Sequence, residues 1–276
     1  MSNYGAGVQF LGGICVLLLI FKAFTKDMGY KFLYTLFIYI AVAATAMAQE
    51  KVVQNRPYTD LRPIHFGIVV GGNMQDLEFN NVGPQTLTLQ DGSQIESLVT
   101  CDQHNWDGGF NVGVLAEFRL NQYFAFRVAP QLYFGTRSIA FYNFMQQQDT
   151  GAPMMQRQSM KTVYVGANCD IIFASQRFNN HRPYIMAGIA PMANLSTRAN
   201  DYIQLKSFDI FAEIGLGLDL YLPFFKLRPE LKFMYGLTNA LNTKHADNLR
   251  DAEMLPYAAS VNKATSKMIV LSFYFE

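Results

Sequence analysis

Ser97, Asp102, His104 and Asp107 lie in one polar stretch and are of the types that hydrolases use. In a hydrolase, a hydroxyl is the nucleophile, a neighbouring histidine is its base, and a carboxylate orients the histidine. Polar loops contain such residues by chance far more often than hydrolases do. We therefore expect no enzyme activity, and a lipid-modifying outer-membrane enzyme stays as an alternative.

The histidines do not indicate a metal centre. None has the spacing of a zinc motif, in which two histidines four residues apart flank a glutamate, and none lies near a Cys-x-x-Cys pair. The sequence also has no Gly-rich phosphate-binding loop. We expect no cofactor and no metal. The histidines are His65, His104, His181 and His245.

The ionisable side chains with a regular spacing lie at every second position of long apolar runs. Residues 208–221 read FDIFAEIGLGLDLY, and residues 227–236 read LRPELKFMYG. One alternate set of positions is uncharged throughout, and the other holds the charged residues. A period of two predicts strands. Their length suits a bilayer-spanning strand, which needs about 9–11 residues, better than a globular sheet, where about five or six is usual.

Eight such runs occur along the chain. The connections between them are mostly long and short in turn, as in bacterial outer-membrane barrels, and eight is an allowed strand number. We predict an all-β fold, an eight-stranded antiparallel transmembrane up-and-down β-barrel, in the outer membrane of a Gram-negative bacterium. The runs cover residues 64–73, 109–120, 123–135, 161–173, 184–195, 208–221, 227–236 and 267–275.

A soluble lipocalin-like barrel is the alternative fold. Its strands would point apolar residues inward and charges toward water. It explains neither the uncharged, aromatic-rich face of every run nor the unequal loops, so the sequence favours the membrane barrel. Within the longer connections, residues 73–108 and 136–159 are rich in Asn, Gln and Asp and are expected to be loops.

The polar faces of the runs predict a charged lumen. An eight-stranded barrel is just wide enough inside for side chains to fill it, and a buried unpaired charge is very costly. These groups should therefore pair and form a structural plug; a proton or ion path is the alternative. They are Glu117, Arg119, Arg127, Asp170, Asp209, Glu213, Asp219, Arg228, Glu230 and Lys232.

The first 48 residues differ in composition from the rest. Residues 28–48, MGYKFLYTLFIYIAVAATAMA, combine a basic residue, an apolar core and a small-x-small end at Ala46 and Ala48. This is the layout of a secretory signal peptide. Cleavage after Ala48 makes Gln49 the mature N-terminus.

The remaining organisation follows from this leader. We interpret residues 1–27 as an upstream extension of a chain that starts at Met28, and an additional membrane anchor is the alternative. Residues 49–63, which contain Pro57 and Pro63, are expected to form an extended periplasmic lead-in. Residues 64–276 form the barrel.

Composition limits the partners. The formal net charge is +1, which argues against a nucleic-acid partner. We expect a monomeric barrel in contact with outer-membrane lipid. Cys101 and Cys169 are too few for a disulfide framework and are expected to be free thiols.

Residues 58–73, YTDLRPIHFGIVVGGN, resemble the opening of the PorT family, eight-stranded outer-membrane barrels of Bacteroidetes. The likeness lies in the Tyr-x-Asp tract at Tyr58, the His-Phe-Gly entry and Asn73. Residues 227–232, LRPELK, resemble the seventh strand of this and related barrel families.

The resemblance implies an accessory component of the type IX secretion system, which exports proteins with C-terminal targeting domains. Its implied partners are other secretion-system proteins, and a barrel too narrow for a folded protein would act by contact and not as a pore. A small OmpA/OmpX-like envelope-stabilising or adhesion barrel is the alternative function.

We predict that outer-membrane material contains a mature chain beginning at Gln49, because the Ala46-Met47-Ala48 sequence matches a signal-peptidase site. N-terminal sequencing or peptide mass analysis of that material checks this. Peptides from residues 2–26 in the same material would contradict both the cleavage site and the Met28 start.

Overall fold

The computed structural model describes residues 53–88, 92–103, 105–147, 153–196, 202–243, 245 and 254–276. The expected signal peptide, with Ala46, Ala48 and Gln49, and the upstream residues 1–27 lie outside the described residues. The described helices are short: the 3-10 helix η1 (Thr59–Leu61) and α3 (Leu255–Ala258). No helix among these residues is long and apolar enough to cross a bilayer.

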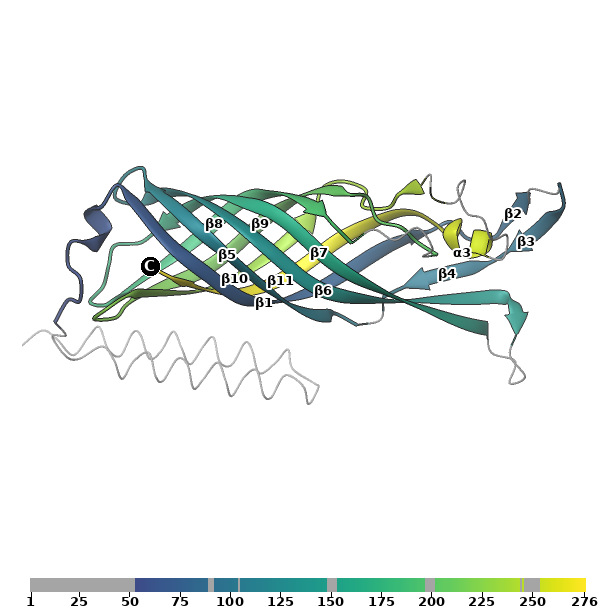
Figure 1. Cartoon of the computed structure of the whole chain (residues 1–276), viewed down its shortest axis with the longest axis horizontal. Helices are drawn as coiled ribbons and strands as arrows, with labels where there is room; N and C mark the ends of the chain where they lie inside the picture. Colours follow the sequence, from purple (N-terminus) through teal and green to yellow (C-terminus); the bar gives the residue numbers. More distant parts are fainter. Residues whose placement is uncertain are drawn as a thin grey trace, which may run out of the picture. The chain divides into compact units, whose positions relative to one another are not determined.

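Eight strands form a closed antiparallel ring (Figure 1). Following the sheet from β5, each strand pairs with the next in the order β5-β1-β11-β10-β9-β8-β7-β6, and β6 pairs again with β5. The predicted all-β barrel is confirmed. Its strands are β1 (Ile64–Asn81), β5 (Asp107–Arg119), β6 (Phe124–Gln147), β7 (Pro153–Ala174), β8 (His181–Asn194), β9 (Phe208–Tyr221), β10 (Lys226–Gly236) and β11 (Val261–Phe275).

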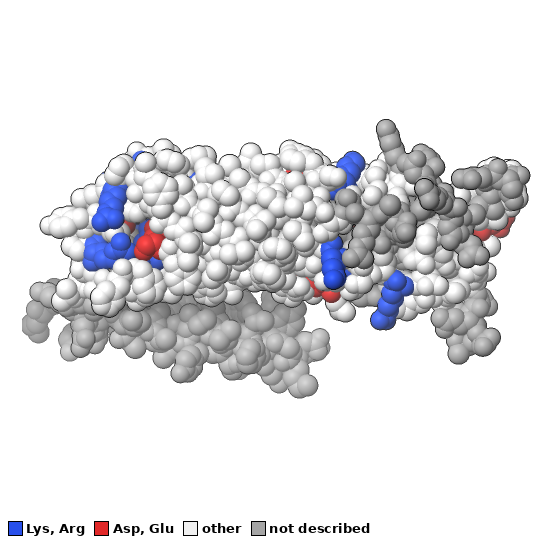
Figure 2. Space-filling view, in the orientation of Figure 1, with Lys and Arg blue, Asp and Glu red and all other residues white. Residues whose placement is uncertain are grey.

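The outer face of the ring is apolar, as the alternation predicts. Phe66, Ile185 and Ile214 are 73%, 59% and 64% exposed, and each lies between neighbours that point inward. On the face seen in Figure 2, one group of charged side chains lies near the left end and another lies partway toward the right end, and the wall between them is almost uncharged. Because lipid tails cannot solvate charge, this band is the part of the wall that faces the membrane.

Three strands continue well beyond the length that a membrane requires. β1, β6 and β7 have 18, 24 and 22 residues, against the roughly 9–11 needed to cross a bilayer. The expectation that residues 73–108 and 136–159 form loops is therefore wrong over most of their length. The former also contains β2 (Gln85–Thr88), β3 (Gln94–Ser97) and β4 (Val99–Asp102), and β4 pairs with the outer half of β6.

Side-chain amides explain how these Asn- and Gln-rich segments can be ordered. Asn81 accepts from the backbone N–H of Cys101 at 2.7 Å and donates to its carbonyl at 3.1 Å. Gln158 makes the same two bonds with the backbone of Ile203, both at 3.1 Å. Each amide thus takes the place of a strand residue at a sheet edge, where unpaired backbone groups would otherwise be buried.

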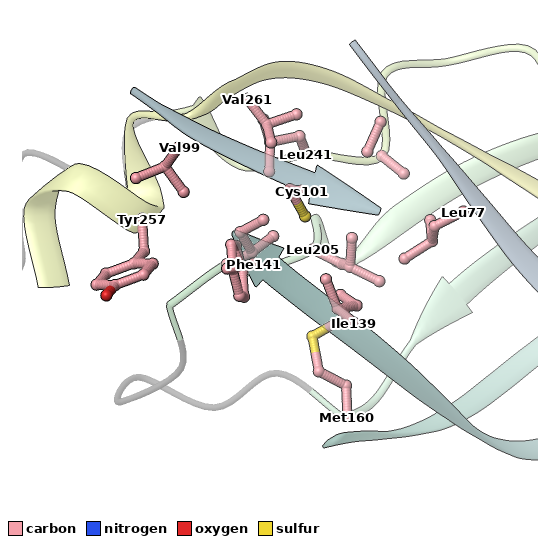
Figure 3. Close-up of a cluster of buried hydrophobic side chains, with 13 residues drawn as sticks. Leu77, Val99, Cys101, Ile139, Phe141, Met160, Leu205, Leu241, Tyr257 and Val261 are labelled. Atoms are coloured by element: carbon pink, nitrogen blue, oxygen red, sulfur yellow. The ribbon is translucent and has the colours of Figure 1, made fainter. Parts of the chain in front are cut away.

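These extensions enclose a second apolar core, which we call the cap (Figure 3). Tyr202 and Tyr257 both pack edge to face on Phe141, with ring centroids 5.5 and 5.7 Å away. The cap covers the end of the barrel that carries the long connections. Its buried members are Leu77, Val99, Cys101, Ile139, Phe141, Met160, Ile203, Leu205, Ala240, Leu241, Tyr257, Val261 and Ala264.

The opposite end carries the short turns, residues 120–123, 175–180 and 222–225, and is periplasmic by the usual orientation of such barrels. Here residues 53–63 are not the extended arm expected from the sequence. Asn55 donates from its backbone to the Asn180 side chain at 2.8 Å and from its own side chain to the Tyr221 carbonyl at 3.0 Å. Arg177 lies 3.7 Å above the Tyr221 ring and binds the carbonyls of Asn55 and Arg56. The lead-in therefore folds against the turn end of the barrel.

Three prolines interrupt the strand ladders without shifting them. Pro130, Pro191 and Pro229 each fall in a two-residue gap in pairing with one neighbouring strand, and the register is the same on both sides of the gap. Each proline lacks the N–H that this neighbour would bind. A bulge is therefore not needed to accommodate them.

Candidate functional site

The lumen holds the largest group of buried ionisable side chains and is the candidate functional site. Two inward glycines make room for them. A Cβ on Gly217 would lie 2.3 Å from the Tyr184 ring, and a Cβ on Gly188 would lie 2.4 Å from the carboxylate of Asp170. Large polar side chains therefore lie flat against the neighbouring backbone at these positions.

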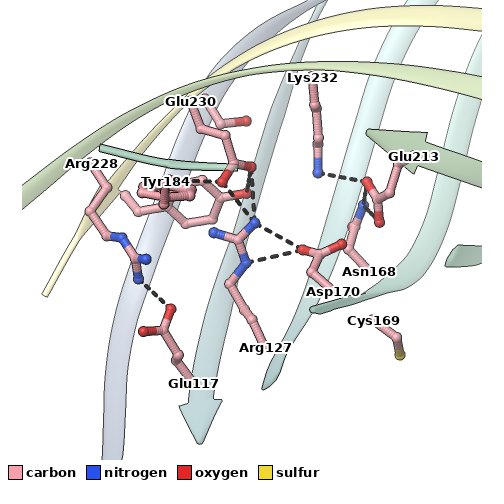
Figure 4. A network of polar contacts seen from close by, with 12 residues as sticks. Glu117, Arg127, Asn168, Cys169, Asp170, Tyr184, Glu213, Arg228, Glu230 and Lys232 are labelled. Atoms are coloured by element: carbon pink, nitrogen blue, oxygen red, sulfur yellow. Dashed lines mark hydrogen bonds and ion pairs between the residues drawn. The ribbon is translucent and has the colours of Figure 1, made fainter. Parts of the chain in front are cut away.

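Arg127 occupies the middle of the lumen with no exposed surface (Figure 4). Its guanidinium donates to Asp170 on the adjacent strand at 2.9 and 3.0 Å. It also donates to both oxygens of Glu230 at 2.8 and 3.0 Å. Tyr184 and Tyr274 donate their hydroxyls to the same Glu230 carboxylate at 2.8 and 3.0 Å. Both residues that accept from Arg127 are thus carboxylates, while Nη1 of Arg127 and Oδ1 of Asp170 have no protein partner among the described residues.

The Arg127–Glu230 pair crosses the full width of the barrel. Arg127 is on β6 and Glu230 is on β10, and four pairing steps separate these strands in either direction around the ring. In an eight-stranded ring, such strands are diametrically opposite. The ion pair, in which Nη2 of Arg127 contacts both oxygens of Glu230, therefore lies across the bore.

Arg228 forms a second charged group nearer the turn end. It pairs with Asp219 and with Glu276, both at 2.6 Å, and with Glu117. Lys226 also pairs with Glu276. Lys226 is in a turn by sequence, yet the structure places it inside the lumen mouth at 2% exposure. Glu276, the residue after the last strand, has a side chain only 4% exposed and joins both cations.

The third group lies on the other side of Arg127. Lys232 is 3.0 Å from Glu213, which also accepts from the Asn168 amide at 2.7 and 3.0 Å. Tyr133 donates to Asn168 at 3.1 Å. Beyond this third group, a buried apolar layer fills the lumen. It includes Tyr133, Tyr164, Ala190, Met192, Phe211, Met234, Met268 and Val270.

Arg137, a lumen cation not recognised in the sequence, lies beyond this layer. Its guanidinium donates to Gln75 and Ser266, both at 3.2 Å, and stacks 5.5 Å from the centre of the Tyr164 ring. Thr162 donates to the same Gln75 oxygen at 2.8 Å. The alternation of inward and outward residues continues in β6 past residue 135 and would have placed Arg137 in the lumen. The polar composition of that segment favours a loop instead.

Two of the ten residues expected in the lumen plug form no ion pair with an oppositely charged side chain among the described residues. Asp209 is buried and accepts from the Thr238 hydroxyl and the Ile210 N–H. Arg119, the last residue of β5, lies at the rim, where it donates to the carbonyls of Asn121 and Leu61. Arg119 is thus outside the plug because its strand ends at this point.

The four residues of hydrolase type do not form a described site. Ser97 is buried on β3, and Asp107 accepts from the Ser138 N–H at 2.5 Å and the Gln103 amide at 3.2 Å. His104 lies outside the described residues. Among the residues described, no group of three His, Cys, Asp or Glu side chains could hold a metal ion.

Both expected free thiols are found in the described barrel. Cys169 is half-buried and Cys101 is buried in the cap, and neither is in a disulfide. Burial raises the pKa of the Cys101 thiol, since the thiolate would have no water around it. Cys101 therefore behaves as an apolar core residue and not as a nucleophile.

Taken together, the apolar wall, the closed ring and the self-paired lumen define a small outer-membrane β-barrel. A family model described as "Outer membrane protein beta-barrel domain" matches residues 47–242, more than half of the chain, and the chain belongs to this family.

Comparison with solved structures finds outer-membrane proteins at low identity. OprG from Pseudomonas aeruginosa is 12% identical, with a TM-score of 0.42, over 76% of this chain and 93% of its own. Neisserial surface protein A is 11% identical, with a TM-score of 0.37, over 77% and 98%. Ail of Yersinia pestis is 10% identical, with a TM-score of 0.33, over 76% and 96%. No curated protein sequence matches the chain.

We predict that Arg127→Leu destabilises the barrel by about 3–5 kcal/mol, because it leaves Asp170 and Glu230 buried without their cation. Arg119→Leu, the same substitution at the rim, should cost about 1 kcal/mol or less. Denaturant unfolding in lipid vesicles measures both. Equal losses would show that the central ion pair does not carry the stability of the lumen.

Proposed function

We propose that this barrel supports protein secretion as a PorT-like accessory component of the type IX system, acting through protein contacts. It is neither the conduit nor an enzyme in this proposal. The likeness of residues 58–73 to the PorT opening supports the secretion role, and the lumen supports the contact mechanism.

One observation carries the contact mechanism: the Arg127–Glu230 pair lies across the bore between opposite strands. A folded or extended polypeptide cannot pass without breaking it, and the groups on either side of it are packed as well. The cap covers one end, and the lead-in folds against the turns at the other. A barrel of this kind has its two ends, and not its interior, available to partners.

The periplasmic end offers a defined surface for such contacts. The lead-in and the turn at residues 175–180 are joined by Arg177 and Asn180, so that segments far apart in sequence form one face. Tyr58 and Phe178, at 76% and 56% exposure, project from it. Exposed aromatic side chains next to arginines are typical of protein interfaces.

An envelope-stabilising or adhesion role is the second candidate, and one observation favours it. The β6–β7 hairpin continues past the cap, and Phe144 and Met145 near its tip are 46% and 53% exposed. If the cap end faces the cell exterior, this tip is placed to contact molecules outside the cell.

We expect deletion of the protein to leave cargo with C-terminal targeting domains unprocessed in the periplasm, while other outer-membrane proteins stay at normal levels. The secreted and periplasmic proteomes measure this. Cargo at the cell surface at wild-type levels would contradict the secretion role.

Matched variants in the complemented strain then separate the two candidates. Phe178→Ser alters the periplasmic face, and Phe144→Ser alters the tip of the β6–β7 hairpin. Both side chains are about half exposed. The proposal expects export to fail only in the first, with both barrels assembled. Loss of export only in Phe144→Ser would place the contact at the outer end. Loss of host or surface attachment only in Phe144→Ser would favour adhesion.

A further inference from the structure

A small cavity opens at the periplasmic mouth of the barrel, beside the β5–β6 turn. Its volume is about 30 Å³, and because a water needs at least about 10–15 Å³ on this measure, it has room for about two. Arg119 and Arg182 line its rim together with Asn121 and Tyr123, while Glu117 and Arg228 lie among its other lining residues. We call this cavity the vestibule.

The two rim arginines line the same cavity and bind adjacent carbonyls of one turn. Arg119 donates through Nε to the carbonyl of Asn121 at 3.3 Å, and Arg182 donates through Nη2 to the carbonyl of the next residue, Gln122, at 2.7 Å. Second bonds, from Arg119 to the Leu61 carbonyl and from Arg182 to the Ser175 carbonyl, fix their orientation. All four acceptors are neutral, so none of these bonds neutralises either guanidinium charge.

The carboxylates near the vestibule are already engaged. Glu117 and Asp219 pair with Arg228, and Asp60 accepts from the Tyr221 hydroxyl at 2.7 Å. Among the residues that the structure describes, no carboxylate lies within ion-pair distance of Arg119 or Arg182. Nη2 of Arg119 and Nη1 of Arg182 also have no hydrogen-bond partner in this part of the chain.

We propose that the vestibule binds one carboxylate of an acidic polypeptide segment from a periplasmic partner. Arginine side chains recognise carboxylates through paired N–H donors, and the cavity volume has room for a group about the size of two waters. A phospholipid headgroup fits less well, since the vestibule lies within the mouth of the ring, lined by inward-facing Ala125 and Ala174, and not on the lipid-facing wall.

Exposed apolar side chains on the lead-in, which bonds to Arg119 through the Leu61 carbonyl, favour a polypeptide over a cell-wall stem peptide. Leu61, whose carbonyl binds Arg119, is 60% exposed, and Tyr58 on the same lead-in is 76% exposed. Apolar residues that flank an acidic one can pack on these side chains, whereas murein offers mainly sugars and charged groups. The inference deepens the proposed function by giving the chemistry of a periplasmic protein partner.

The test uses the purified full chain in a neutral detergent with ¹⁵N-labelled arginine. The probes are two capped tripeptides, leucine-aspartate-leucine and leucine-asparagine-leucine. We expect the aspartate peptide to shift the side-chain Nε signals of Arg119 and Arg182 and to bind at least about tenfold more tightly than the asparagine peptide. Equal binding of the two peptides would overturn the proposal, and this comparison requires no variant.

Variants locate the site. The double variant Arg119→Gln and Arg182→Gln should weaken binding of the aspartate peptide about tenfold or more. Arg62→Gln, an exposed arginine at the same end that does not line the vestibule, should change it less than about twofold. Unchanged binding in the double variant would overturn the proposal, as would equal weakening in the control.

A soluble muropeptide serves as the competing probe, and tighter binding of it than of the aspartate peptide would overturn the proposal in favour of the cell wall. Heat-modifiable gel mobility shows that each variant is folded, and Arg182→Gln alone replaces the double variant if that one is not. These binding results are independent of secretion. Normal export in the deletion strain would refute the proposed function and leave carboxylate binding standing. Equal binding of the two peptides would refute carboxylate binding and leave the proposed function standing.

Discussion

A polar lumen enclosed by a wall in lipid has to satisfy its own charges, and the Arg127–Asp170–Glu230 group is where this constraint is met. Water cannot compensate a missing partner at 0% exposure. Two tyrosine hydroxyls also donate to Glu230, and the ion pairs of Arg228 and Lys232 on either side satisfy further charges along the bore. The inward glycines follow from it as well, because any other residue at positions 217 and 188 would place a Cβ against Tyr184 and Asp170.

The ends of the barrel depend on a related constraint. Strands that leave the membrane expose backbone N–H and C=O groups that need partners. In the cap, Asn81 and Gln158 provide them from their side chains. At the turn end, Arg177 binds carbonyls of the lead-in, and Arg56 donates to the Glu276 carbonyl at 3.0 Å. Closure of both ends thus arises from polar side chains that bind the main chain.

Strand number, strand facing and most lumen residues could be predicted from sequence, because lipid enforces a strict alternation over each run. Which charges pair could not, since Arg127 meets Glu230 only when the ring is closed and its order is known. Lys226 and Glu276 were missed because they lie at strand ends. The cap was missed because Asn and Gln are common in loops, and their role as backbone partners depends on residues distant in sequence, such as Ile203 for Gln158.

The central claim is that contacts between opposite strands close the lumen. Single-channel recording in planar bilayers with the purified monomer tests it most directly. We predict no stable conductance at moderate voltage, because ions cannot pass the paired groups around Arg127 without breaking buried ion pairs. A steady open channel from the monomer would contradict the account, since it would require a continuous water-filled path through the layer that this structure fills.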